Sequence, residues 1–200
     1  MDKHVDILIV GAGISGIGLA AHLSKHCPHR TFEIIERRES FGGTWDLFKY
    51  PGIRSDSDMS TFGFNFKPWK KASVLADGAS IKNYLSEVVE ECQLESRIHY
   101  QHRVLNANYD THTHKWSVKI ENAQGKTETW VANFVLGCTG YYNYDQGFQP
   151  EFPNQDAFKG TFIHPQHWPE NFDYSGKKVV IIGSGATAIT LVPAMVKGGA

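Results

Sequence analysis

Val5-Asp6-Ile7-Leu8-Ile9-Val10-Gly11-Ala12-Gly13-Ile14-Ser15-Gly16 passes from an apolar run into glycines spaced as G-x-G-x-x-G. This pattern predicts a β-strand, a phosphate-binding loop and a helix. In such a loop Gly11 permits the tight turn, Gly13 lets the backbone approach a pyrophosphate, and Gly16 lets the helix pack on the strand. The N-terminus of the helix then faces the phosphates. The motif predicts a dinucleotide site, although by itself it also fits an ordinary strand-to-helix turn.

A second apolar run, Thr31–Ile35, ends at Glu36. An acidic residue about 20 positions after the glycines is expected to accept hydrogen bonds from a ribose 2′-OH. A helix from Ser15 to about His26, closed by Pro28, joins the two strands through a right-handed crossover. These features together predict a βαβ dinucleotide-binding unit.

The composition bounds the remaining possibilities. The 200 residues are 41% hydrophobic and 12% aromatic, enough for one full domain with a buried core and part of another. A formal net charge of −1 gives no long-range field for nucleic acid or an acidic membrane surface. We therefore expect neither of these as a partner.

The cellular compartment is predicted from the termini and the cysteines. Met1-Asp2-Lys3-His4 leads directly into a strand, without a signal-peptide pattern, and no apolar segment is long enough to span a bilayer. Cys27, Cys92 and Cys138 are odd in number and form no C-x-x-C pair, which suits a reducing compartment. We predict a cytoplasmic protein whose cysteines serve in packing.

The segment after Glu36 contains a second pair of glycines, Gly42 and Gly43. Their spacing allows the loop to fold back over the same ligand, which favours FAD over NAD, although an ordinary glycine turn remains the alternative. The following stretch, Asp46–Met59, mixes turn formers with aromatics and charges and is expected to be an ordered loop held over a site. Within it, Asp56 and Asp58 are either site carboxylates or solvated turn residues.

The middle of the chain changes its periodicity several times. The aromatic stretch Phe62–Trp69 alternates like a half-buried strand or the wall of a site, and its rings are expected to pack in the core. A helix is predicted from Ser80, with Ile81, Leu85, Val88, Val89 and Cys92 on its apolar face. Period-two patterns then predict an antiparallel β layer. Its strands are expected at His102–Ala107, Lys115–Ile120 and Thr129–Ala132, with a turn at Asn122–Gly125. A separate buried strand, Phe134–Gly140, is predicted to return to the parallel sheet.

A second glycine fingerprint lies in Lys177–Ala188, with Ala188 at the last position. Two fingerprints in one chain predict two dinucleotides. Between them, Pro165 and Pro169 prevent a long helix, so His164 and His167 are not a helical zinc pair. His112 and His114 have no second pair of ligands near them in the sequence, and no metal site is predicted.

The residues that join the two fingerprints resemble the Baeyer–Villiger monooxygenases. Phe158-x-Gly160-x-x-x-His164-x-x-x-Trp168-Pro169 matches the fingerprint of that family. The related flavin-containing monooxygenases usually carry Tyr or Phe at the position of Trp168. Three further stretches are similar to the ethionamide-activating members: Gly42–Trp45, Tyr50–Met59 and Gly140–Asp145.

The resemblance implies an α/β fold with a three-layer, Rossmann-like FAD-binding domain at residues 1–145 that carries an inserted antiparallel β layer. A linker at 146–176 and the start of an NADPH-binding Rossmann domain at 177–200 follow. The family continues past Ala200 into the rest of the NADPH domain, a catalytic arginine and a last FAD-binding segment.

The resemblance also assigns roles to individual residues. It implies that Asp56 lies beside the flavin and orients the downstream arginine, that Thr187 caps its helix, and that His164 and Trp168 couple domain rotation to cofactor use. The FAD contacts implied are Gly11, Gly13, Ser15, Gly16, Glu36, Thr44, Trp45, Asp46, Leu47, Asp56 and Val104. The NADPH contacts implied are Arg54, Gly183, Ser184, Gly185, Ala186, Thr187 and Ala188.

The activity that the resemblance implies is oxidation of ketones to esters, and of thioethers or thioamides to S-oxides, with NADPH and O2 through a flavin C4a-peroxide. The alternatives are a flavin-containing monooxygenase that hydroxylates N or S atoms and a stand-alone FAD-binding module. A disulfide reductase is disfavoured because the cysteines are unpaired. We expect residues 1–200 alone to be inactive.

Overall fold

The computed structural model describes residues 3–200, which divide into two compact units. The first unit consists of the chain up to Asp46 together with Lys82–Gly140. The second consists of Leu47–Ile81 and Tyr141–Ala200. The second glycine fingerprint thus shares its unit with a segment from the first half of the chain. The domain boundaries drawn from the sequence at residues 145 and 176 stay a prediction.

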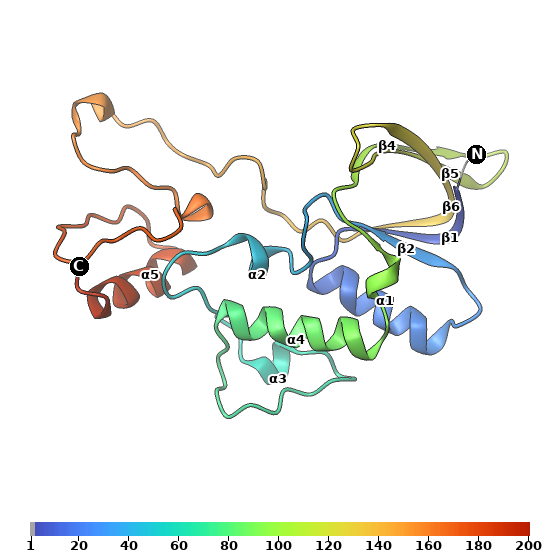
Figure 1. Ribbon diagram of the computed structural model, residues 1–200, viewed down its shortest axis with the longest axis horizontal. Helices are drawn as coiled ribbons and strands as arrows, with labels where there is room; N and C mark the ends of the chain where they lie inside the picture. The colour runs from blue at the N-terminus through green and yellow to red at the C-terminus, as the bar shows by residue number, and fades with distance from the viewer. Residues whose placement is uncertain (1–2) are drawn as a thin grey trace. The chain divides into compact units, whose positions relative to one another are not determined.

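The first unit begins with the predicted βαβ element, which the structure confirms. Strand β1 (Lys3–Val10) leads into helix α1 (Ile14–His26) and then into β2 (Phe32–Ile35). The two strands are parallel, with Ile9 opposite Ile34, and α1 runs along one face of them (Figure 1). This arrangement brings the loop at residues 11–13 to the carboxyl end of β1, where ligands bind in open α/β sheets.

Helix α4 (Gly78–Glu91) confirms the helix predicted from Ser80. The predicted apolar face is buried at Ile81, Leu85, Val88 and Val89, whereas Cys92 is half-buried. A short 3-10 turn (Glu95–Arg97) then leads into β3 (Ile98–His99), which pairs in parallel with β2.

The antiparallel layer is formed by β4 (Arg103–Asp110), β5 (Lys115–Glu121) and β6 (Thr127–Gly137), which complete a sheet of order β3-β2-β1-β6-β5-β4. Strand β6 belongs to both parts of the sheet, since Trp130 is opposite Val118 on antiparallel β5 and Lys3 on parallel β1. The sequence-based prediction of two separate strands here is wrong. One continuous strand changes its set of partners along its length.

The last part of β6 is also more exposed than predicted. Pairing with β5 ends at Ala132, whereas pairing with β1 continues to Gly137. Beyond Ala132 the strand therefore has a partner on one edge only, and Phe134 is 63% exposed. The expectation of a buried strand over Phe134–Gly140 does not hold for this side chain.

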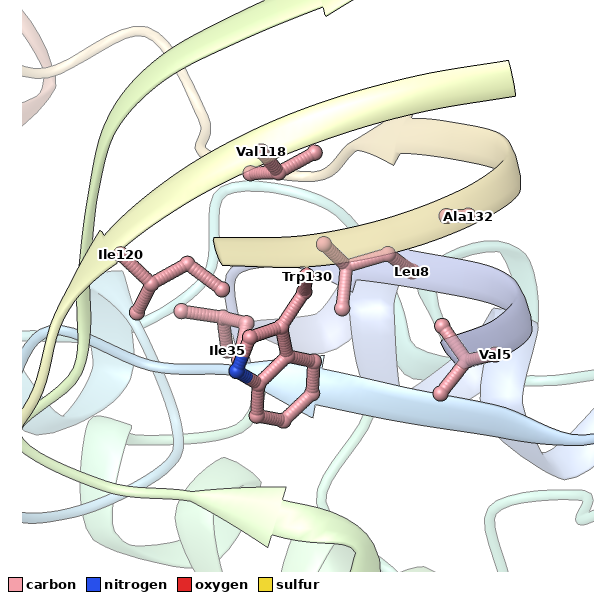
Figure 2. Close-up of a cluster of buried hydrophobic side chains, with 7 residues drawn as sticks. All are labelled: Val5, Leu8, Ile35, Val118, Ile120, Trp130 and Ala132. Atoms are coloured by element: carbon pink, nitrogen blue, oxygen red, sulfur yellow. The ribbon is translucent and has the colours of Figure 1, made fainter. Parts of the chain in front are cut away.

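One core cluster of the first unit gathers side chains from β1, β2, β5 and β6 around the indole ring of Trp130 (Figure 2). Its buried members are Val5, Leu8, Ile35, Val118, Ile120, Trp130 and Ala132. The cluster joins the parallel and antiparallel parts of the sheet, which therefore share one core.

The aromatic stretch Phe62–Trp69 does not form the predicted strand. Helix α3 (Met59–Phe62) precedes it, because Asp58 caps the helix by accepting a hydrogen bond from the Thr61 N–H at 3.0 Å. The chain then turns, and the rings of Phe64 and Phe66 stack with their centres 4.9 Å apart. Local capping therefore outweighs the period-two pattern.

The second unit has its own core around helix α5 (Ala186–Lys197), which packs with Phe48 and Tyr50 through Leu191 and Met195. The apolar run before α5, at residues 177–184, has no strand assignment, because no described segment pairs with it. Two 3-10 turns, Gln155–Ala157 and Pro165–His167, are the only helical elements between residues 140 and 185. No helix within residues 3–200 has the length and apolar character needed to cross a membrane.

Candidate functional site

The loop between β1 and α1 has the geometry of a phosphate cradle. Gly11 has a φ of +106°, and a Cβ there would lie 2.5 Å from the carbonyl oxygen of Cys138. A Cβ on Gly16 would overlap the carbonyl oxygen of Gly11. Gly13 is the N-cap residue of α1, and no side chain makes a capping hydrogen bond to the first turn. The cradle therefore fits a dinucleotide, since backbone N–H groups at a helix start can approach a pyrophosphate.

Glu36 is tied to this loop by its carboxylate. The side chain is 6% exposed; Oε2 accepts a hydrogen bond from the Ala12 N–H at 2.8 Å and Oε1 accepts one from the Arg38 N–H at 2.9 Å. Each carboxylate oxygen keeps a second lone pair, so a ribose hydroxyl can still donate to it. The residue predicted to bind the ribose also fixes the loop predicted to bind the pyrophosphate.

The second glycine pair folds back over the first loop, as the sequence predicted. The Gly42 N–H donates to the Ala12 carbonyl at 2.9 Å, and a Cβ on Gly13 would lie 3.7 Å from the Cα of Gly43. Helix α2 (Thr44–Leu47) starts directly after this contact. Thr44 and Trp45 are half-buried, whereas Ser15 at the start of α1 is exposed.

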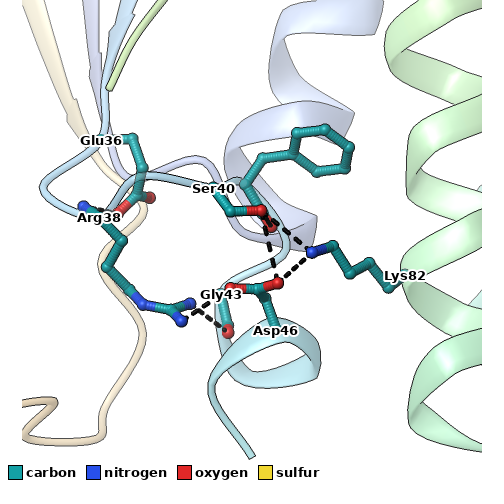
Figure 3. Close-up of polar contacts among 7 residues, drawn as sticks. Glu36, Arg38, Ser40, Gly43, Asp46 and Lys82 are labelled. Atoms are coloured by element: carbon teal, nitrogen blue, oxygen red, sulfur yellow. Dashed lines mark hydrogen bonds and ion pairs between the residues drawn. The ribbon is translucent and has the colours of Figure 1, made fainter. Parts of the chain in front are cut away.

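Asp46 at the end of this loop lies in a charged network (Figure 3). Its side chain is 7% exposed; Oδ2 lies 2.7 Å from Nη2 of Arg38, and Oδ1 contacts Nζ of Lys82. Ser40 Oγ accepts a hydrogen bond from Lys82 at 3.0 Å, and the Arg38 guanidinium donates to the Gly43 carbonyl at 3.4 Å. The network ties the glycine loop to α4 through residues that the sequence analysis did not select, Arg38 and Lys82.

Val104 lies half-buried on β4, opposite Ile120 and beside a break in the strand register before Asn106. The backbone N–H of His102 donates to the Glu36 carbonyl at 2.9 Å, so the start of β4 lies next to the ribose-binding candidate. This agrees with the predicted backbone contact of Val104 with an adenine, which itself stays a prediction.

The loop with Arg54 and Asp56 belongs to the second unit. Ser55, which is 3% exposed, donates its N–H to the Ala76 carbonyl at 2.9 Å and holds this loop in place. Asp56 is exposed, while Asp58 caps α3, and hydrogen bonds from the hydroxyl and N–H of Thr61 lower the pKa of Asp58. Of the two roles considered for these carboxylates, a local structural role therefore describes Asp58. The proposed role of Asp56 in the site stays a prediction.

The second fingerprint forms the start of α5. Gly183 has a φ of +138°, and Gly185 is the N-cap residue, without a side-chain hydrogen bond. The predicted capping role of Thr187 is wrong, because Thr187 lies within the first turn of the helix instead of before it. Ser184, Ala186 and Ala188 flank this open helix start, where the residues fit a second pyrophosphate.

The linker residues form local contacts in the second unit. His164 Nδ1 accepts a hydrogen bond from the Gln166 N–H at 3.2 Å, and the buried Gln166 amide donates to the Asn143 carbonyl at 2.6 Å. Trp168 packs on the Phe48 and Leu191 cluster. Phe158 is 61% exposed, with its ring against Gly160, and Pro169 follows Trp168 in an extended segment.

No group of three or more metal-binding side chains occurs within residues 3–200. Cys27, Cys92 and Cys138 are all free thiols.

The comparisons with known proteins agree with this geometry. The family described as flavin-binding monooxygenase-like matches residues 3–198. The chain belongs to this family. The predicted α/β fold, with a Rossmann-like FAD-binding domain, is shared with solved monooxygenases. A steroid monooxygenase bound to NADP matches 98% of the chain, at 27% identity and a TM-score of 0.82. An open form of cyclohexanone monooxygenase matches 98% of it, at 26% identity and a TM-score of 0.83.

Among curated members of the flavin-binding monooxygenase-like family, a probable FAD-binding monooxygenase AlmA from Acinetobacter baylyi is 77% identical over the whole chain. The FAD-containing monooxygenase EthA from Mycolicibacterium smegmatis is 56% identical over the same 200 residues. The chain spans 40% of the length of each of these relatives, and 37% and 38% of the two solved chains.

Proposed function

We propose that this chain contributes the FAD-binding region and the start of the NADPH-binding region of a Baeyer–Villiger monooxygenase. The reaction is oxidation of a ketone to an ester with NADPH and O2, and sulfur compounds are a second substrate class. The observation that carries the proposal is the pair of hydrogen bonds that joins Glu36 to Ala12 and Gly42 to Ala12. These bonds join three segments of one dinucleotide site: Glu36, which would bind the ribose, the loop with Ala12, which would bind the pyrophosphate, and the loop with Gly42, which would cover the ligand.

The comparisons support the same reading. The AlmA and EthA relatives are named as FAD-binding and FAD-containing monooxygenases. The cyclohexanone-bound and ε-caprolactone-bound structures of cyclohexanone monooxygenase resemble the chain with TM-scores of 0.82 and 0.81. A cyclic ketone and the corresponding lactone are the substrate and product of the proposed chemistry.

The residues of the chain then have separate tasks. The N-terminus of α1, with Gly11, Gly13 and Gly16, binds the FAD pyrophosphate, and Glu36 accepts a hydrogen bond from the ribose. The segment Thr44–Leu47 contacts the flavin end, and Arg54 and the start of α5 bind NADPH. Bound FAD supplies the redox chemistry with NADPH and O2. Asp56 orients an arginine that we expect after residue 200.

The test uses the full-length protein, purified with its cofactor. We expect bound FAD, oxidation of NADPH that depends on a ketone, and one oxygen atom incorporated into an ester that mass spectrometry detects. Residues 1–200 alone should bind FAD more weakly and form no ester at a sustained rate. A full-length protein without FAD, or one that leaves ketones unchanged, would contradict the proposal.

The rival function is hydroxylation of N or S atoms in the same family. A ketone and a thioether assayed side by side distinguish the two: S-oxide without any ester favours the rival. The cytoplasmic location stays a prediction, to be checked by fractionation of cells that produce the protein.

A further inference from the structure

Gly52 lies directly against the backbone of α5. Its φ is +83°, and a Cβ at this position would overlap the carbonyl oxygen of Thr190 and lie 2.7 Å from the Cβ of Ala194. No side chain fits between the loop and the helix at this point. The loop backbone and the helix backbone therefore touch, and only glycine permits the contact.

The residues before Gly52 hold the same helix through an apolar core. Phe48 and Tyr50 are 8% and 5% exposed and form a buried cluster with Leu191 and Met195 on α5. Thr190 is 3% exposed, and its hydroxyl lies 3.5 Å from the hydroxyl of Tyr50. The loop is therefore packed against α5 through buried side chains as well as through the backbone of Gly52.

The residues after Gly52 are fixed as well. The Gly78 N–H donates to the Ile53 carbonyl at 3.0 Å, and the Ser55 N–H donates to the Ala76 carbonyl at 2.9 Å. Arg54 and Asp56 flank Ser55, so these hydrogen bonds fix the backbone that carries them shortly after Gly52. At the other end of the contact, Thr190 lies about one helical turn after Ala186, the first residue of α5.

We propose that Gly52 is a positioning residue that sets the register between the loop with Arg54 and Asp56 and the helix that binds NADPH. This inference rests on the function proposed above. The contact keeps the side chains of the loop in a constant arrangement with the nucleotide at the start of α5. A Cβ at Gly52 would push loop and helix apart and disturb hydride transfer from NADPH, while FAD binding stays intact.

The test compares Gly52→Ala with Gly125→Ala in the full-length protein. Gly125 has a φ of +72° and nothing within 4 Å of a Cβ, so its replacement brings the backbone strain without the collision. We expect Gly52→Ala to slow flavin reduction by NADPH on the order of tenfold to a hundredfold, since small misplacements cost that much. FAD content and reduction by dithionite should match the wild type.

Two further measurements do not depend on turnover. Gly52→Ala should weaken NADP⁺ binding in a titration and speed amide hydrogen exchange in residues 186–197, whereas Gly125→Ala should change neither. Ala194→Val adds bulk to the same contact from the helix side and should reproduce both effects. It replaces Gly52→Ala if that variant does not fold.

Wild-type reduction by NADPH in Gly52→Ala would overturn the proposal. Equal losses with NADPH and dithionite, or loss of FAD, would overturn it too, because they indicate a structural role only. If the wild-type protein holds no FAD or is not reduced by NADPH, the proposed function fails instead. In that case, faster amide hydrogen exchange in α5 of Gly52→Ala than in α5 of Gly125→Ala would still support the packing contact between Gly52 and the helix.

Discussion

Glu36 Oε2 accepts a hydrogen bond from the backbone N–H of Ala12 at 2.8 Å. The acidic residue at the end of β2 and the glycine loop after β1 are therefore one hydrogen-bonded structure. A change at Glu36 acts on both ends of the proposed adenosine-diphosphate site.

Replacement of Glu36 by Gln should lower the free energy of unfolding by about 1–3 kcal/mol, because an amide cannot accept from both backbone N–H groups in the same way as a carboxylate. FAD affinity should fall as well. Urea denaturation and FAD titration of the same preparations measure the two effects. Glu39→Gln is the matched control, since Glu39 is exposed, and equal behaviour of the two variants would contradict this role of Glu36.

The pair of Asp46 and Lys82 should show energetic coupling. Lys82→Met leaves the ion pair between Asp46 and Arg38 in place, and we expect the free energy of unfolding to fall by about 1–2 kcal/mol, a small loss because the Lys82 side chain is 34% exposed. A double-mutant cycle with Asp46→Asn measures the coupling directly, and a value above about 0.5 kcal/mol is expected for residues in contact. Additive losses would mean that the two side chains do not depend on each other.

Glu33 should make stability depend on acid pH. Burial alone would raise its pKa, but the hydrogen bond from His99 and the charge of Lys3 outweigh burial and lower the pKa below the ordinary 4.5. This stabilisation is complete above the ordinary pKa and is lost as the pH falls through the lowered value. The free energy of unfolding, measured by urea denaturation near pH 6 and near pH 3.5, should therefore change less between the two pH values in Glu33→Gln than in the wild type. An identical pH effect would exclude a contribution from Glu33.

Trp130 is 2% exposed, and its indole Nε1 has no hydrogen-bond partner among the described residues. Trp130→Phe removes this unsatisfied N–H along with some volume, so we expect a loss of only about 1 kcal/mol. Trp130→Ala should cost about 3–5 kcal/mol, as large core truncations do. Thermal unfolding compares the two variants. Similar losses for both would indicate that the N–H is satisfied, for example by a water molecule.

Local patterns predicted the parts of the fold that depend on near neighbours in the sequence. The β1-α1-β2 unit follows from an apolar run, glycine spacing and an acidic residue about 20 positions on. The apolar face of α4 follows from helical periodicity. Lys82 lies on the same helix, but its partner Asp46 is 36 residues earlier, and a lysine on a helix ordinarily faces solvent. No local signal indicates that network.

The division of β6 into two predicted strands has a specific cause. Asn133 interrupts the apolar pattern between Ala132 and Phe134 and suggests a break. In the structure its amide donates to Asp6 Oδ1 at 2.9 Å, so this polar residue holds β6 to β1 instead of ending the strand. Its partner is more than one hundred residues away, so the sequence pattern alone did not reveal it.

The double role of β6 also affects how the chain is made. β1 pairs with β6 from Lys3 opposite Trp130 to Val10 opposite Gly137, so one edge of β1 stays empty until the ribosome has synthesised most of the first unit. At about 5–20 residues per second this interval lasts roughly ten seconds. During it, the unpaired edge of β1 can accept another extended chain. The nascent protein is therefore most open to intermolecular β-pairing before β6 emerges, and chaperone binding to the first strand would protect it most in that interval.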